Sequence, residues 1–365
     1  MNEEVGSKDP QVAFAIGGLG GNNAFGAGFL QAALDNDVKP AMITCTSGQI
    51  WWVSKYVQAI EQKPVPIDYL RKDMEEFIKS TEPFHQHDLD LLYMNLHGKS
   101  GMMRTAFPEF ILDMMKNTIS VFERILQQGK KTFFARELMS EWPVRVLIPR
   151  FSNEFFANIS NVFKNCDIGI AFNSYDPIDG MEVVHLNPKA QDLLDKKPGD
   201  KSSHRSRTLY KDIKPEYVKN GLWLFQYGFE DCSIIDGCYF RGVMLSEAAI
   251  AENVFVSRPI NYKWIGKLPT NYIENEDLKT EISFNGSYQG ERDKIIMINN
   301  LIKPEEGAKP EEGVLKKYHH VDLREVEIET QRGFFDYVFE DINVFDRARE
   351  LADAAFKSYK KPLKT

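Results

Sequence analysis

The chain has 365 residues, with 45 Lys and Arg against 53 Asp and Glu and a formal net charge of −8. This balance argues against a sequence-independent grip on nucleic acid, which needs a basic surface. Hydrophobic residues make up 43% of the chain, enough for a sizeable core, and no apolar run approaches the roughly 20 residues of a membrane span. The acidic first ten residues are unlike a signal peptide, and the four scattered cysteines unlike a disulfide framework. We therefore predict a globular, cytoplasmic protein.

The first 62 residues predict alternating strands and helices. Short apolar runs at 12–17 and 41–45 predict buried strands, and each ends at a turn of small residues. Helical apolar spacing follows at 26–34 and again at 50–62. Strands and helices that alternate in this order predict a parallel α/β unit with right-handed crossovers.

Residues 64–140 differ in character from the segments on either side. They hold seven of the 12 methionines, at positions with helical spacing, and show few strand signals. Methionine fills irregular gaps in a core, and it also adapts to varied apolar ligands. We predict a helical insertion that serves either as a layer of the core or as a cap over an apolar substrate.

The second half of the chain predicts further strands, a hairpin and a final helix. Strands are expected at 143–149, 166–174, 181–187, 233–237 and 293–299, the second and third of these forming a hairpin through the turn at 177–180, and an amphipathic helix at 345–361. No linker stands out. We expect one domain over 11–300, with residues 301–365 adding a loop and a helix packed on it.

A glycine-rich turn follows the first predicted strand. Gly17, Gly18, Leu19, Gly20 and Gly21 lead towards a helix, an arrangement that lets backbone N–H groups approach an anion closely. A dinucleotide site is one interpretation, since a GxGxxG pattern begins at Gly18. Two features disfavour it: Asn23 replaces the third glycine, and the acidic Asp37 lies before the next strand rather than at its end.

A second sharp turn, at residues 44–49, follows the second predicted strand. A serine on a tight strand-to-helix turn projects its hydroxyl outward beside a helix N-terminus, the geometry of a nucleophile elbow. Taken alone, Ser47 in this turn is more simply explained as a helix N-cap. The neighbouring glycine turn changes that balance, because one site then offers both a nucleophile and backbone donors for an oxyanion.

Three ordered motifs resemble those of the patatin-like phospholipase family. The segments are AIGGLGGNNAFGAGFLQAAL, ITCTSGQIWWV and IKPEYVKNGLWLFQYGFEDCSIIDGCYFRGVMLSEAA. They are similar to the family's glycine-rich oxyanion loop, its GxSxG elbow and its aspartate motif of the DGG or DGA type. The resemblance covers roughly residues 11–60 and 166–255.

The resemblance implies a three-layer α/β/α domain with a mostly parallel sheet, a helical cap and a lipid acyl hydrolase activity. Ser47 would be the nucleophile and Asp236 the base, with no histidine. The oxyanion would be held by backbone amides around Gly18, Leu19 and Gly20 in the 17–21 loop, with Gly48 and Gly237 in support. The family chemistry implies no cofactor and no metal. The expected partner is a lipid or another acyl-ester substrate, with peripheral contact to a membrane left open and no nucleic acid.

Each motif keeps its reactive residue and departs from the family pattern around it. Cys45 and Gln49 replace the two elbow glycines, Asn22 and Asn23 replace a cation and a glycine, and Cys238 replaces a small residue. Gln49 is bulky, so we expect its side chain to point away from the strand–helix crossing. Besides a lipid hydrolase, the sequence leaves open a catalytically impaired protein that binds lipid or a protein partner, and a soluble esterase or thioesterase.

Two histidine pairs are weak candidates for a metal site. His85 and His87 lie two residues apart, and His319 and His320 are adjacent. Neither pair has a second cluster at ligand spacing, so no metal site is predicted.

Overall fold

The computed structural model describes residues 12–18, 23–62, 64–81, 103–105, 107–128, 145, 147–149, 151–202, 206–270, 272–302, 318–329 and 341–360. The described strands are β1 (Val12–Ile16), β2 (Met42–Cys45), β3 (Met103–Thr105), β4 (Leu147–Pro149), β5 (Gly169–Asp176), β6 (Met181–Leu186), β7 (Thr208–Asp212), β8 (Ile235–Asp236), β9 (Asn253–Arg258) and β10 (Asp322–Glu327). The described α-helices are α1 (Asn23–Asp35), α2 (Gln49–Glu61), α3 (Tyr69–Thr81), α5 (Phe107–Gln128), α7 (Asn153–Asn165), α8 (Pro188–Leu194), α9 (Pro215–Gly221), α10 (Leu245–Ala248), α11 (Tyr272–Ile302) and α12 (Ile342–Lys360).

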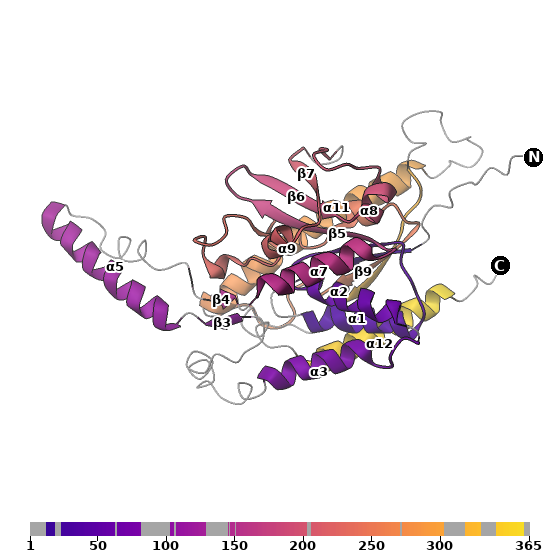
Figure 1. The fold of residues 1–365 in the computed structure, drawn as a ribbon, viewed down its shortest axis with the longest axis horizontal. Helices are drawn as coiled ribbons and strands as arrows, with labels where there is room; N and C mark the ends of the chain where they lie inside the picture. Colours follow the sequence, from indigo (N-terminus) through magenta and orange to yellow (C-terminus); the bar gives the residue numbers. More distant parts are fainter. Residues whose placement is uncertain are drawn as a thin grey trace, which may run out of the picture.

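A mostly parallel sheet forms the centre of the protein (Figure 1). Its strands follow the order β10-β9-β1-β2-β5-β6-β7. The strands from β10 to β5 are parallel, β6 runs antiparallel to β5, and β7 is parallel to β6. The β5–β6 pair is the predicted hairpin, and β1, α1, β2 and α2 follow the predicted order. The predicted α/β class with a mostly parallel sheet is confirmed.

Helices cover both faces of the sheet, because the central strands are apolar on both sides. On one face, alternate residues such as Phe14, Ile43 and Phe255 pack against α1, α2, α7 and α12. On the other face, Ala15 and Val256 pack against α10 and α11. Strands buried on both faces carry near-continuous apolar runs, as parallel strands in α/β proteins do. The arrangement is three layers, helix on sheet on helix.

Helix starts follow local capping chemistry. The Ser152 hydroxyl accepts the Phe155 N–H at 3.1 Å and caps α7. The Asn187 side chain accepts the Ala190 N–H at 2.9 Å, with proline in the first turn of α8. Such caps satisfy backbone N–H groups that a helix leaves unpaired at its N-terminus.

One predicted strand is wrong. Residues 293–299 lie inside α11, a helix of 31 residues. Short apolar runs do not distinguish a strand from a helix by periodicity alone. Here Tyr288 and Ile295, seven residues apart, face the sheet, while Met297 is exposed. The buried positions therefore follow the period of a helix rather than that of a strand.

Three strands of the sheet were absent from the sequence prediction. These are β7, β9 and β10, and β10 pairs in parallel with β9 over its whole length. Residues 301–365 therefore contribute a strand to the central sheet in addition to α12, which packs on α1. Within the predicted strand at 143–149, residues 143, 144 and 146 lie outside the described residues, and β4 pairs with β3 in a separate two-stranded sheet.

The segment at 64–140 is helical over α3 and α5, as predicted, and also contains the short strand β3. Met74 of α3 is fully buried in the core, and α3 contacts α1, α2 and α12. The long helix α5 extends away from the sheet (Figure 1), with Met115 exposed. The first part of the segment is thus a layer of the core. Within the described ranges, no helix combines the length and apolarity needed to cross a bilayer.

Candidate active site

Sheet register brings the two predicted reactive residues together. β2 ends where Cys45 pairs with Phe172 of β5, and β8 then pairs Asp236 with Ser174, two residues further along β5. Because β6 occupies the opposite edge of β5, β8 lies on the same edge as β2, just beyond the end of β2. Ser47 follows Cys45 by two residues and therefore lies next to β8, just beyond the end of β2. Residues 189 positions apart in the chain therefore meet at the carboxyl end of the sheet.

Ser47 has the strained backbone of a nucleophile elbow. Its φ of 56° lies in the left-handed region, which a non-glycine residue adopts at a cost of about 1–3 kcal/mol. The turn is held by Gln49 N–H donating to the Thr46 carbonyl and Ile50 N–H donating to the Ser47 carbonyl, at 3.2 and 3.0 Å. Gly48 precedes α2, so the positive end of that helix lies beside the serine. The Ser47 side chain is not the cap, since no side-chain cap hydrogen bond forms at α2.

Asp236 is fully buried, and burial disfavours the charged form of its carboxyl group. Its Oδ1 accepts the Cys238 N–H at 2.9 Å, and its Oδ2 has no hydrogen-bond partner within the described structure. Burial raises the pKa of Asp236 from 3.8 to about 6, while interaction with the Ser47 hydroxyl opposes the rise. The hydroxyl is therefore close to the carboxylate without a well-aligned bond to Oδ2, a geometry that catalytic pairs often tighten when substrate binds.

The glycine turn docks directly on the elbow. A Cβ on Gly18 would lie 2.2 Å from the Thr46 carbonyl oxygen and 2.6 Å from Ser47 Cβ, so only glycine fits. The Gly18 N–H donates to Thr46 Oγ1 at 2.8 Å, and the Gly17 N–H donates to the Ser257 carbonyl at 3.0 Å. These two amides hold the loop in place and already have acceptors.

These two hydrogen bonds reduce the number of backbone amides in the predicted loop that are available to an oxyanion. Leu19, Gly20 and Gly21 lie outside the described residues, and with Gly17 and Gly18 engaged they are the remaining amides of the predicted loop. Gly48 supplies the amide that follows Ser47, a position that donates to the oxyanion in enzymes with nucleophile elbows. A Cβ on Gly48 would lie 2.4 Å from Asn23 Oδ1, so this position also requires glycine.

The Gln49 side chain points towards α1. Its side chain is fully buried and lies between α1 and α2, where a Cβ on Gly26 would lie 2.3 Å from its Oε1. Its Nε2 is 3.2 Å from the Asn23 carbonyl oxygen and 3.4 Å from Asn23 Oδ1. Two departures from the family pattern, Gln49 and Asn23, therefore contact each other, and Gly26 makes room for them.

This fit predicts strong coupling between positions 26 and 49. Gly26→Ala should lower the unfolding free energy, because overpacking costs about 1–3 kcal/mol and exceeds the roughly 1 kcal/mol helix gain of alanine. In a Gln49→Ala background the same change should be neutral or stabilising, since the obstructing amide is gone. Urea denaturation of the four proteins measures the coupling, and additive effects would contradict the proposed packing.

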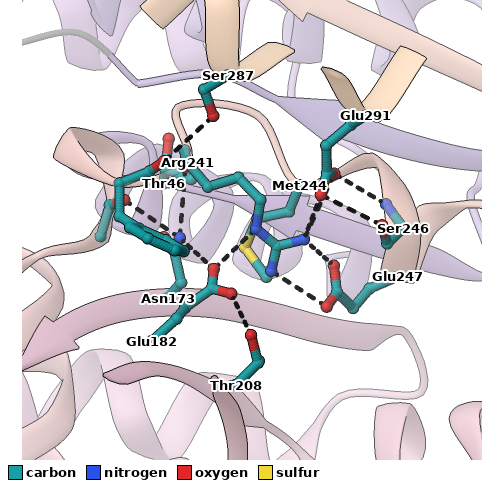
Figure 2. A network of polar contacts seen from close by, with 12 residues as sticks. Thr46, Asn173, Glu182, Thr208, Arg241, Met244, Ser246, Glu247, Ser287 and Glu291 are labelled. Atoms are coloured by element: carbon teal, nitrogen blue, oxygen red, sulfur yellow. Dashed lines mark hydrogen bonds and ion pairs between the residues drawn. The ribbon is translucent and has the colours of Figure 1, made fainter. Parts of the chain in front are cut away.

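The segment that carries Asp236 is anchored by a fully buried arginine (Figure 2). Arg241 Nε donates to Glu182 of β6 at 2.7 Å, and Nη1 donates to Glu247 of α10 at 2.7 Å. Glu291 of α11 also accepts from Nη1, at 3.2 Å. The cluster ties β6, α10 and α11 to the aspartate segment, and burial raises the pKa of Glu247.

Hydroxyl and amide side chains fix the backbone of the same segment (Figure 2). Thr46 Oγ1 donates to the Gly242 carbonyl at 2.8 Å, and because this hydroxyl also accepts the Gly18 N–H, it joins the glycine turn, the elbow and the aspartate segment. Asn173 Nδ2 lies 3.3 Å from the Gly237 carbonyl oxygen. A Cβ on Gly237 would lie 2.2 Å from the Asn173 side chain, which explains the glycine after Asp236.

Sequence reasoning missed a second serine pair. Ser174 Oγ lies 2.8 Å from His185 Nε2, and both residues are buried. His185 stacks between Phe172 and Tyr217, with ring centroids 4.9 and 4.8 Å away. Burial lowers the pKa of His185 from 6.5 to about 3, which makes it a weak base. Ser174 lies within a strand rather than on a strained turn, so the pair is suited to a structural role.

Across the described ranges, no group of three or more His, Cys, Asp or Glu side chains is placed to hold a metal ion. His85 and His87 lie outside those ranges. A comparison with models of known protein families gave no match, and a comparison with curated protein sequences found no relative of this chain.

Proposed function

We propose that this protein is a serine acyl hydrolase of the patatin-like type, which cleaves the acyl ester bond of a lipid with Ser47 and Asp236. The observation that carries the proposal is the meeting of a strained, buried Ser47 with a buried Asp236 whose pKa is raised to about 6. A base with a pKa near 6 is largely ionised at neutral pH and still able to accept a proton.

The chemistry follows from these two side chains. Asp236 accepts the Ser47 hydroxyl proton as Oγ attacks the ester carbonyl carbon, and the negative charge moves to the carbonyl oxygen. When the tetrahedral intermediate collapses, the carbon–oxygen bond to the alcohol breaks and Asp236 returns the proton to the leaving oxygen. Water then attacks the acyl–Ser47 ester and gives a proton to Asp236. When this second intermediate collapses, the bond to Ser47 Oγ breaks, Asp236 returns the proton to Oγ, and the fatty acid is released. Amides beside the elbow stabilise both oxyanions, and each amide donor lowers the activation free energy by about 2.7–4 kcal/mol.

The main alternative is a catalytically impaired protein that binds lipid or a protein partner. The contacts of the altered residues favour catalysis over loss of function. Gln49 bonds to Asn23 in a space that Gly26 leaves open. Substitutions that accumulate without selection for the site need not fit one another in this way. A soluble esterase or thioesterase would use the same residues and differ only in substrate.

Labelling with a fluorophosphonate probe tests the proposal directly. The probe should modify the wild-type protein and leave Ser47→Ala unmodified, because only an activated serine reacts. Ser174→Ala is the matched control: it removes another buried serine close to Asp236 and should retain labelling. A folded wild-type protein that takes no label, or a label that survives in Ser47→Ala and disappears in Ser174→Ala, would sink the assignment.

A further inference from the structure

Two threonines at the carboxyl end of β2 bond the backbone that leads into α10. Thr44 lies in β2, Thr46 follows the strand directly, and both side chains are fully buried. Thr44 Oγ1 donates to the Met244 carbonyl at 2.7 Å, and Thr46 Oγ1 donates to the Gly242 carbonyl at 2.8 Å. Two hydroxyls of the same kind therefore bond carbonyls two residues apart in the aspartate segment.

Thr46 differs from Thr44 in a second bond, which its hydroxyl accepts from the Gly18 N–H at 2.8 Å. The direction of both Thr46 bonds is fixed by chemistry, because the N–H only donates and the Gly242 carbonyl only accepts. The single hydroxyl proton therefore points to Gly242. The glycine turn and the aspartate segment are joined through one buried oxygen atom, which belongs to the residue before Ser47.

The bond to Gly242 acts on Asp236 through a short turn that is closed by its own hydrogen bonds. The Arg241 N–H donates to the Gly237 carbonyl at 2.8 Å, and the Cys238 N–H donates to Asp236 Oδ1 at 2.9 Å. Restraint of the backbone at Gly242 is therefore transmitted to the carboxylate.

The bond to Gly18 restrains the glycine turn where it passes the elbow. A Cβ on Gly18 would lie 2.2 Å from the Thr46 carbonyl oxygen and 2.6 Å from Ser47 Cβ, so the two turns are in direct contact. A buried N–H that loses its acceptor is costly, and the turn would shift to find another. The predicted oxyanion loop continues directly from Gly18, so such a shift would move its amides relative to Ser47.

We propose that Thr46 is a positioning residue of the hydrolase, whose hydroxyl holds the glycine turn and the aspartate segment at fixed positions on either side of Ser47. This inference rests on the proposed function and adds a residue to it. The Thr46 hydroxyl acts through Gly18 and Gly242 and not on the substrate. A displacement of about 1 Å at a catalytic group costs about 10²-fold in rate. Loss of the hydroxyl should therefore lower the rate of the chemical step and leave substrate affinity nearly unchanged.

Thr46→Val tests the inference, with Thr44→Val as its matched control. Valine has nearly the shape of threonine and lacks the hydroxyl. With p-nitrophenyl hexanoate as substrate, Thr46→Val should lower kcat by about 10²-fold and keep KM within about threefold. Thr44→Val also loses a buried hydroxyl that bonds the aspartate segment, but it leaves the Gly18 bond intact, so its kcat should stay within about threefold of wild type.

Thr46→Ser separates the hydroxyl from the packing of the side chain. Serine keeps the hydroxyl and loses only the methyl group, so it should recover kcat to within about fivefold of the wild type. A Thr46→Ser protein as slow as Thr46→Val would assign the loss to packing and overturn the positioning role.

Hydrogen exchange measures the link between the two segments without turnover. In Thr46→Val, the peptide that contains Gly18 should exchange at least about tenfold faster than in wild type, because its amide has lost the acceptor. The same peptide in Thr44→Val and in Thr46→Ser should exchange at the wild-type rate. Mass spectrometry of peptides from the four proteins gives these rates.

The two measurements distinguish failure of the inference from failure of the proposed function. If the wild type hydrolyses the ester and Thr46→Val keeps its kcat, or Thr44→Val loses as much, the positioning role is overturned and the hydrolase function stands. If the wild type releases no nitrophenol, the hydrolase function fails and the positioning role fails with it. Faster exchange at Gly18 in Thr46→Val would then identify the hydroxyl as a structural link alone.

Discussion

Asp236→Asn should abolish acyl hydrolysis and at the same time make the protein more stable. Loss of the base should lower kcat/KM by about 10³- to 10⁴-fold, the range found when a positioned general base is removed. The stability gain follows from burial, which raises the pKa of Asp236 from 3.8 to about 6. A neutral amide of the same shape avoids placing a charge in that environment.

The direction in which the stability changes with pH distinguishes the desolvation of Asp236 from a general effect of the substitution. Between pH 4 and 6 the folded protein retains a proton on Asp236 that the unfolded chain has released, so unfolding free energy falls as pH rises through that window. Above pH 6 the ionised aspartate costs about 3 kcal/mol, which Asp236→Asn should recover. Wild-type kcat/KM should rise through pH 6 and then level off, because the ionised form is the base.

Urea denaturation of both proteins at pH 4.5 and pH 8 measures the gain, and Asp231→Asn is the control. Asp231 is exposed and belongs to the same region of the chain, so its substitution should change neither activity nor stability appreciably. An Asp236→Asn protein that is less stable than wild type at pH 8, or that keeps its activity, would contradict the assignment of Asp236 as a desolvated base.

Arg241→Met should cost about 3–5 kcal/mol of stability, the largest effect expected outside the reactive pair. The substitution leaves Glu182, Glu247 and Glu291 facing one another in the interior without a cation. Because Arg241 anchors the segment that carries Asp236, labelling of Ser47 should also fall in any folded fraction. Chemical denaturation and probe labelling measure the two effects on the same samples.

The loss of stability in Arg241→Met should become smaller as the pH falls. Burial raises the pKa of Glu247 and the Arg241 guanidinium opposes that rise, so without Arg241 the folded state binds this proton more readily as the pH falls. The difference between Arg241→Met and wild type should therefore shrink from pH 8 towards pH 5. Arg347→Met is the control, because its ion pairs with Glu329 and Glu350 are half exposed and screened by solvent, so their loss should have little effect on stability. A cost of similar size at both sites would refute the role of the buried cluster.

Local sequence was sufficient to predict the first two strand–helix units of the fold. The apolar runs at 12–17 and 41–45, each followed by a helical pattern, predicted β1, α1, β2 and α2 within a few residues. Strong periodicity and turn residues are local signals, which explains this success. The sequence also indicated Ser47 as a candidate nucleophile, because a serine on a strand-to-helix turn beside a glycine turn is a local pattern. Asp236 was assigned only through the resemblance of its motif.

Tertiary structure alone decided how these residues are supported. The pairing of β8 with the edge of β5 beyond β2 brings Asp236 to Ser47, and pairing between distant segments depends on register that a single sequence does not display. The burial of Gln49 against Gly26 depends on the distance between two helices. The charge cluster around Arg241 joins carboxylates from three elements far apart in the chain. Composition and periodicity determine which elements form, whereas desolvation and packing between elements determine what the site can do.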